Sequence, residues 1–162
     1  MTVREWTTHS PAATQAIGAA LGACVAGGQV IALRGDLGAG KTTFVQGLAR
    51  GLGVTSRVSS PTFVLVNEYA AARGLRLVHV DTYRLGAAAA DEAEAIGLDE
   101  LLADPGAVVA IEWAERVADL LPADHLLLEL RYGVSEDERV LRLTAFGPAA
   151  AAVMQCLPSL HL

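Results

Sequence analysis

The chain has 162 residues, 52% of them hydrophobic, and a formal net charge of −6. This length fits a single domain spanning residues 1–162, which can bury a core without a disulfide or a structural metal. The negative charge argues against a protein that grips nucleic acid with its own surface, and no uninterrupted apolar segment reaches the roughly 20 residues that a membrane span needs.

The amino terminus and the cysteines both indicate a cytoplasmic protein. Residues 1–11, MTVREWTTHSP, carry charged and polar side chains where a signal peptide needs an apolar segment. Cys24 and Cys156 belong to no CxxC pair and have no histidine at a metal-ligand spacing. We therefore expect two unpaired, small core residues in a reducing compartment.

The first predicted elements are a short strand and a helix. Residues 4–7 are expected to form the strand. Ser10 and Pro11 are typical of a helix start, with serine as the N-cap and proline in the first helical position. The helix is expected to run to about Val25, because Gly27 and Gly28 then end it.

The most informative stretch comes next, at residues 29–52. An apolar run at residues 30–33 predicts a buried strand, and a helical pattern begins at Lys41. Between them lies GDLGAGKT, residues 35–42, which matches the phosphate-binding pattern G-x-x-x-x-G-K-[ST]. Glycines allow successive backbone N–H groups to point at an anion, and the helix start adds its positive dipole. This stretch therefore predicts a site for a nucleoside triphosphate.

The groups of this phosphate loop have distinct expected roles. Lys41 supplies a mobile positive charge for the terminal phosphates, and the Thr42 hydroxyl can ligate Mg²⁺. The residues expected to surround the phosphates are Leu37, Gly38, Ala39, Gly40, Lys41, Thr42 and Thr43.

The rest of the chain alternates strands with helices. The predicted strands lie at residues 62–69, 75–81, 107–113, 125–132 and 140–146. The predicted helices lie at residues 91–102, as one helix or two short ones, 114–121 and 148–157. Short turns join the first two and the last two strands, so these are expected to pair as hairpins. The pattern predicts an α/β three-layer sandwich like that of phosphate-loop NTPases, whose mixed sheet has a parallel core plus two antiparallel hairpins.

Two acidic residues are candidates for holding a metal beside the loop. A phosphate loop needs a carboxylate for Mg²⁺, normally at the carboxyl end of a neighbouring strand, and both Asp81 and Glu112 fit. The pattern does not rank them, because Asp81 is the usual residue type whereas Glu112 ends the more uniformly apolar strand. Residues 59–62, Ser-Ser-Pro-Thr, are either a plain turn or a switch loop that reaches the terminal phosphate.

The motifs that the sequence lacks limit which nucleotide and which reaction we expect. The chain has no Asn-Lys-x-Asp guanine motif, which favours adenine, and no arginine-rich lid, which weakens the alternative of a small-molecule kinase. His79 is interpreted as a packed or surface histidine rather than a catalyst. Trp113 is either a packing residue or a wall of the site.

Four blocks of the sequence resemble the bacterial TsaE family, the ATPases of tRNA threonylcarbamoyladenosine (t6A) biosynthesis. The blocks are GDLGAGKTT at residues 35–43, SPTF at 60–63, HVDTYRL at 79–85 and IEWAE at 111–115. The phosphate loop alone is unspecific, but the four blocks in this order are specific, and the resemblance covers nearly the whole chain.

The resemblance implies a metal site and a catalytic set. Thr42 and Glu112 are the implied ligands of Mg²⁺. The implied catalytic set is Lys41, Thr62 and Asp81, with Thr62 in a switch loop over the γ-phosphate and Asp81 as a catalytic or water-ordering acid.

The resemblance also implies the surroundings of the nucleotide and the partners. Trp113 lies beside the site, and the purine lies between Pro11 and the last hairpin, where Arg139 is the natural cation. Members of the family resemble a motor that docks on the TsaD transferase and its partner TsaB, so tRNA is served only indirectly. A small-molecule kinase and an ATP-dependent binding module remain the alternatives.

Overall fold

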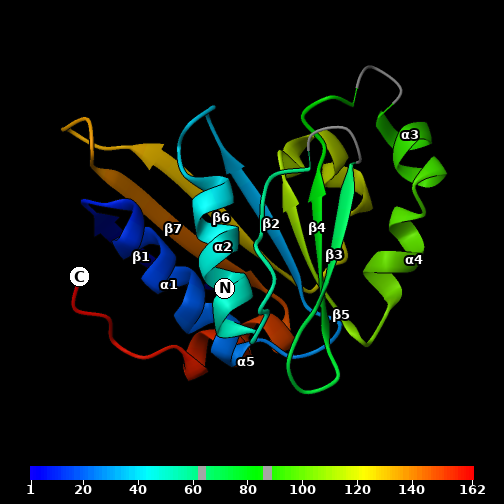
Figure 1. The fold of residues 1–162 in the computed structure, drawn as a ribbon, viewed down its shortest axis with the longest axis horizontal. Helices are drawn as coiled ribbons and strands as arrows, with labels where there is room; N and C mark the ends of the chain where they lie inside the picture. Colours follow the sequence, from blue (N-terminus) through cyan, green and yellow to red (C-terminus); the bar gives the residue numbers. More distant parts are fainter. Residues whose placement is uncertain (62–64, 86–88) are drawn as a thin grey trace.

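The computed structural model of the protein describes residues 1–61, 65–85 and 89–162. Within these residues one mixed sheet holds seven strands in the order β1-β7-β6-β2-β5-β4-β3 (Figure 1). The strands are β1 (Thr2–Thr8), β2 (Val30–Gly35), β3 (Val66–Ala70), β4 (Arg76–Asp81), β5 (Ala107–Glu112), β6 (His125–Tyr132) and β7 (Arg139–Phe146). The predicted fold class is confirmed, and residues 62–64 of the strand predicted at 62–69 lie outside the described residues.

The parallel core lies in the middle of the sheet. β2 pairs in parallel with β5 on one side and with β6 on the other, and β4 pairs in parallel with β5. The outer pairs, β3 with β4, β6 with β7 and β1 with β7, are antiparallel. Because parallel strands share one direction, the carboxyl ends of β2, β4 and β5 meet at one edge of the sheet, where open α/β sheets bind their ligands.

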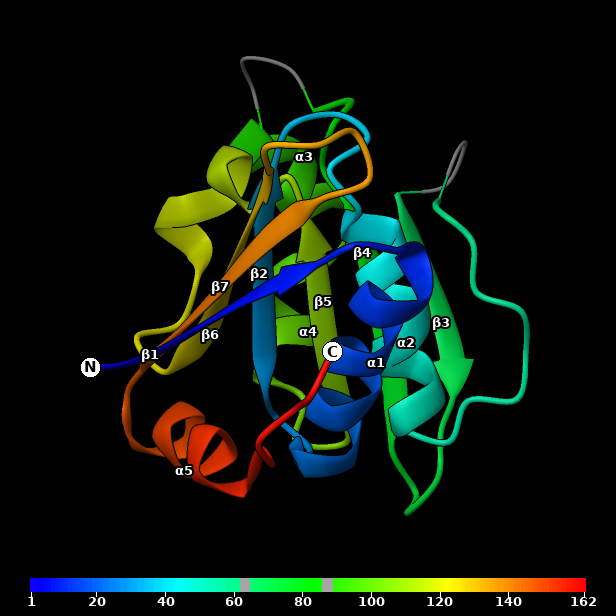
Figure 2. The same ribbon diagram turned by 90° about the vertical axis from the view of Figure 1, so that its left-hand side faces the viewer.

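Helices cover both faces of the sheet. They are α1 (Pro11–Cys24), α2 (Lys41–Gly51), α3 (Ala89–Ala95), α4 (Leu98–Ala103), the 3₁₀ helix η1 (Ala114–Leu120) and α5 (Pro148–Cys156). One face packs against α1, α2 and α5, and the other packs against α3, α4 and η1 (Figures 1 and 2). The segment at residues 91–102, predicted as one helix or two short ones, forms the two short helices α3 and α4. Among the described residues, no helix has the length and apolar character that a membrane span requires.

The alternation of side chains in β2 explains why the core has two sides. Ile31 and Leu33 point into the cluster that contains α1 and α2, whereas Val30 and Ala32 point into the cluster on the opposite face. Successive side chains of a strand alternate between faces, so a strand covered on both faces is apolar throughout. This is why the strand before the phosphate loop reads as an unbroken apolar run.

Glycines allow α1 and α2 to approach backbone to backbone. A Cβ at Gly47 would lie 2.1 Å from the carbonyl oxygen of Gln15, and a Cβ at Gly18 would lie 2.4 Å from that of Phe44. Real side chains do not fit at such separations, so the crossing of the two helices requires glycine. The close contact fixes α2, which begins at Lys41, against α1.

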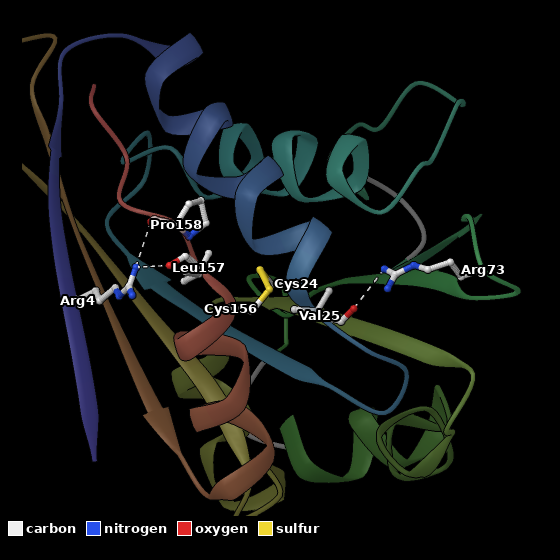
Figure 3. The surroundings of a disulfide bond; sticks show 7 residues. All are labelled: Arg4, Cys24, Val25, Arg73, Cys156, Leu157 and Pro158. Atoms are coloured by element: carbon white, nitrogen blue, oxygen red, sulfur yellow. Dashed lines mark hydrogen bonds between the residues drawn. A yellow bond between two sulfur atoms is a disulfide. The ribbon is translucent and has the colours of Figure 1, made fainter.

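Cys24 and Cys156 form a disulfide, so the expectation of two unpaired core residues is wrong (Figure 3). Each cysteine is the last residue of its helix, and the ends of α1 and α5 bring the two Cα atoms to 5.7 Å. Cys156 is also exposed rather than in the core. Because the two cysteines are 132 residues apart in the chain, no local sequence pattern indicates that they lie close together.

Arginine contacts hold the chain on either side of the disulfide (Figure 3). Arg4 of β1 donates hydrogen bonds to the carbonyl oxygens of Leu157 and Pro158, at 2.8 and 3.1 Å. Arg73 donates to the carbonyl oxygen of Val25, at 3.2 Å. The residues that follow the two cysteines, Val25 and Leu157, are therefore each held by an arginine from another part of the chain.

We predict that reducing the disulfide lowers the free energy of unfolding by about 2–4 kcal/mol, because the cross-link restricts the unfolded chain. Urea unfolding with and without reductant measures the change. The Cys24→Ser and Cys156→Ser variants serve as matched controls, since reductant should not shift their unfolding midpoints. Equal midpoints for the oxidised and reduced wild-type chain would contradict the prediction.

Candidate functional site

The candidate site lies at the carboxyl edge of the parallel strands, beside the loop between β2 and α2 (Figure 1). A cavity of about 350 Å³ opens there. Its lining residues are Leu37, Gly38, Gly40, Lys41, Thr42, Thr43, Ser60, Pro61, Leu65, Asp81, Tyr83, Arg84, Glu112 and Trp113. The structure thus gathers the phosphate loop, both candidate carboxylates and the tryptophan around one hollow.

The backbone of the phosphate loop has the conformation that its glycines allow. Gly38 and Gly40 have φ values of 76° and 105°, in the left-handed region that side chains rarely adopt. The N–H of Ala39 donates to the carbonyl oxygen of Asp36 at 3.0 Å, and the Ala39 side chain is buried in the core. Ala39 therefore contributes backbone to the loop but no lining side chain to the cavity.

Lys41 is buried at the floor of this cavity. Its ammonium donates to the carbonyl oxygens of Gly35 and Asp36, at 2.5 and 3.0 Å. It also lies 3.9 Å from the ring centroid of Trp113, a distance at which a cation is attracted to the aromatic face. Trp113 is therefore a wall of the site and contacts its central cation.

Burial lowers the pKa of Lys41, because a low-dielectric environment disfavours the charged amine. Four carboxylates act in the opposite direction, in decreasing order those of Glu112, Glu115, Asp81 and Asp36. A polyanionic ligand near Lys41 would stabilise the charged form of the amine in the same way.

The two candidate carboxylates lie side by side but have different partners. Asp81 and Glu112 are directly opposite each other in the parallel pairing of β4 with β5. Thr42 Oγ1 lies 3.0 Å from both carboxylate oxygens of Glu112. Asp81 instead accepts hydrogen bonds from the Ser60 hydroxyl at 3.1 Å and from the Tyr83 N–H at 2.9 Å. Hydrogen bonds therefore connect Glu112 to the phosphate loop through Thr42. They connect Asp81 to Ser60, which belongs to the segment predicted to be either a turn or a switch loop.

The donor set of Thr42 and Glu112 fits Mg²⁺. A hydroxyl and a carboxylate are hard oxygen donors, and Mg²⁺ usually takes one or two carboxylates together with substrate phosphates and water. In the part of the chain that the structure describes, no three His, Cys, Asp or Glu side chains form a metal-binding group. A cation that relies on phosphate oxygens does not need such a group.

A second, smaller cavity of about 140 Å³ adjoins the first and shares Gly38, Gly40 and Thr43 with it. Its other lining residues are Ser10, Pro11, Thr14, Asp137 and Arg139. The Arg139 guanidinium lies 4.3 Å from the ring centroid of Tyr132 and donates to the carbonyl oxygen of Gly38 at 3.5 Å. Pro11 and Arg139, expected at the purine, thus line one hollow beside the phosphate loop.

Not every predicted site residue is described, and not every lining residue was predicted. Thr62 lies outside the described residues, whereas Ser60 and Pro61 of the same block line the larger cavity. The sequence analysis did not name five of the lining residues, which are Thr14, Leu65, Tyr83, Arg84 and Asp137. Tyr83 and Arg84 closely follow the strand that ends at Asp81 and lie in the HVDTYRL block, and both signals could have found them.

Comparisons with known proteins agree on one family. The family model described as threonylcarbamoyl adenosine biosynthesis protein TsaE matches residues 8–141. A protein of Bacillus subtilis named tRNA threonylcarbamoyladenosine biosynthesis protein TsaE is 42% identical over 143 residues, which cover 88% of this chain and 86% of the relative. A protein of the same name from Nostoc is 42% identical over 138 residues, which cover 80% of this chain and 78% of the relative.

A solved structure is similar over nearly the whole length. The crystal structure of Bacillus subtilis YdiB superposes with a TM-score of 0.81 and is 35% identical in sequence. The similarity covers 96% of this chain and 94% of that one. The likeness therefore extends over nearly the whole fold.

We predict that Glu112→Ala weakens Mg²⁺-dependent ATP binding more than Asp81→Ala does, because Glu112 is the one of the two acids that is hydrogen-bonded to Thr42. Calorimetric titration with ATP, in Mg²⁺ and in EDTA, measures the gain in affinity due to the metal. Glu112→Ala should lose about 10-fold or more of that gain. A larger loss for Asp81→Ala would exchange the roles of the two acids.

Proposed function

The chain belongs to the TsaE family, and from that membership we propose that it is a Mg²⁺-dependent ATPase required for t6A formation in tRNA. The observation that supports the proposal most is the meeting of the phosphate loop with Glu112 through Thr42. Such a meeting is what binding of a metal–triphosphate complex needs. We propose that residues 1–162 act as one ATPase domain in the cytoplasm.

The proposed nucleotide site uses both cavities. The triphosphate would occupy the larger one, where the backbone N–H groups of residues 37–43 and the Lys41 ammonium would bind its oxygens. The adenine would occupy the smaller one, between Pro11 and Arg139. The shared residues Gly38 and Gly40 put the two hollows next to each other, as one continuous ligand requires.

The proposed reaction is in-line attack of water on the γ-phosphate. Asp81 would order the attacking water, because it lies at the cavity and is not engaged with Thr42. Lys41 and the loop N–H groups would stabilise the charge that develops on the phosphate oxygens. Thr42 and Glu112 would hold Mg²⁺, which would further neutralise the phosphate charge.

The proposed partners are the TsaD transferase and TsaB, whose complex the nucleotide state would gate. The net charge of −6 supports a role through proteins, because a surface that held tRNA directly would be basic. The chain would thus serve tRNA modification without transferring the threonylcarbamoyl group itself.

We predict that Lys41→Ala abolishes tight ATP binding, because it removes the buried cation at the floor of the cavity. Titration with Mg-ATP measures the loss, and thermal unfolding of the variant in the absence of nucleotide serves as the folding control. Full affinity in the folded variant would overturn the assignment of the site.

We also predict that the TsaB–TsaD complex stimulates phosphate release from Mg-ATP, because the cycle is proposed to be gated by that contact. Phosphate release is measured for the chain alone and with added complex, and Lys41→Ala is the matched inactive control. Hydrolysis that is indifferent to the complex would contradict the proposed partners. With γ-labelled ATP, label on an added acceptor instead of inorganic phosphate would favour the kinase alternative.

A further inference from the structure

His79 is a buried histidine with one polar partner among the described residues. It lies on β4 with no exposed surface, and its Nε2 atom is 2.5 Å from the carboxylate oxygen Oε2 of Glu112. The sequence predicted a packed or surface residue rather than a catalyst, and the structure shows a buried one. It also brings His79 into contact with the carboxylate that faces the phosphate loop.

Polar contacts hold the Glu112 carboxylate on two sides. The Thr42 hydroxyl lies on one side of it and the His79 ring on the other. Glu112 is only 3% exposed, and a buried carboxylate needs such hydrogen bonds because it has lost most of its water. If His79 were removed, the oxygen Oε2 would keep only the shared contact with Thr42.

The His79 ring makes its described polar contact through Nε2, to the Glu112 carboxylate. Its Nδ1 atom is buried and has no hydrogen-bond partner within the described residues. The described polar contact of the ring is therefore at the carboxylate that it would orient.

Thr82 holds the backbone at the same point. It is fully buried, and its Oγ1 atom lies 2.9 Å from the carbonyl oxygen of Glu112 and 2.7 Å from that of Trp113. Trp113 has a φ of 58°, a left-handed conformation that a bulky residue adopts only when its surroundings impose it. Thr82 therefore fixes the turn at which β5 ends, immediately after Glu112.

We propose that His79 and Thr82 are positioning residues that orient Glu112 toward Thr42, with His79 holding the side chain and Thr82 holding the backbone. The proposal rests on the proposed function, because it takes Glu112 to be the carboxylate that faces Mg²⁺. His79 does not line the cavity, so it acts through Glu112 rather than on the nucleotide.

Two amide substitutions test the side-chain contact. In His79→Gln the amide nitrogen can take the place of Nε2 and reach Glu112, whereas in His79→Asn it takes the place of Nδ1 and falls short. Both variants keep a polar amide at the buried position, so they form a matched pair. The gain in ATP affinity on adding Mg²⁺, measured by titration in Mg²⁺ and in EDTA, is the readout.

We predict that His79→Gln keeps most of the Mg²⁺-dependent gain and that His79→Asn loses about 10-fold of it, the size of effect typical of partners that orient metal ligands. ATP affinity in EDTA should be the same in both. Equal gains in the two variants would overturn the role of His79, as would equal losses in both Mg²⁺ and EDTA.

A second pair tests the backbone contact and separates this proposal from the proposed function. Thr82→Ser keeps the hydroxyl and should keep the gain, whereas Thr82→Val is nearly the same size and should lose it. Equal gains in this pair would overturn the role of Thr82. If the wild-type chain shows no Mg²⁺-dependent gain, the proposed function fails. If only the variants behave alike, the positioning roles fail and the function stands.

Discussion

The contact between Thr42 and Glu112 joins two parts of the molecule that are 70 residues apart in the chain. Thr42 lies in the first turn of α2, and Glu112 is the last residue of β5. For their oxygen atoms to meet, the helix must sit at a fixed height on the sheet and the strand must end at a fixed residue. Most of the surrounding architecture can be understood as meeting these two requirements.

The height of the helix is set by packing against its neighbour. Gly18 and Gly47 let α1 and α2 touch through their backbones, so neither helix can slide without a steric clash. The end of the strand is set by the parallel register, which puts Glu112 beside Asp81, and by Thr82 at the turn that follows. Small side chains and backbone contacts thus help to set where Thr42 and Glu112 meet.

The sequence alone predicted those features that local patterns encode. The apolar run before the phosphate loop, the glycines within it and the paired strands are all short-range signals. The disulfide and the contact of His79 with Glu112 join residues that are distant in the chain, and periodicity carries no information about such pairs. The sequence pattern could not rank Asp81 and Glu112 for the same reason, because both end apolar strands and their different hydrogen-bond partners appear only in the folded structure.

The charges of the site give a physical reason for the proposal of a divalent cation. Lys41 is one buried cation, and the carboxylates of Glu112 and Asp81 already lie near it. A triphosphate in this cavity would add several negative charges beside two carboxylates, in surroundings that screen charge less well than water. Lys41 cannot balance them all. Without a metal ion, the Glu112 carboxylate would repel the phosphates and weaken the binding of ATP. With a metal ion near both, the carboxylate and the phosphates would each be attracted to the cation, so Glu112 would strengthen the binding of the metal–ATP complex.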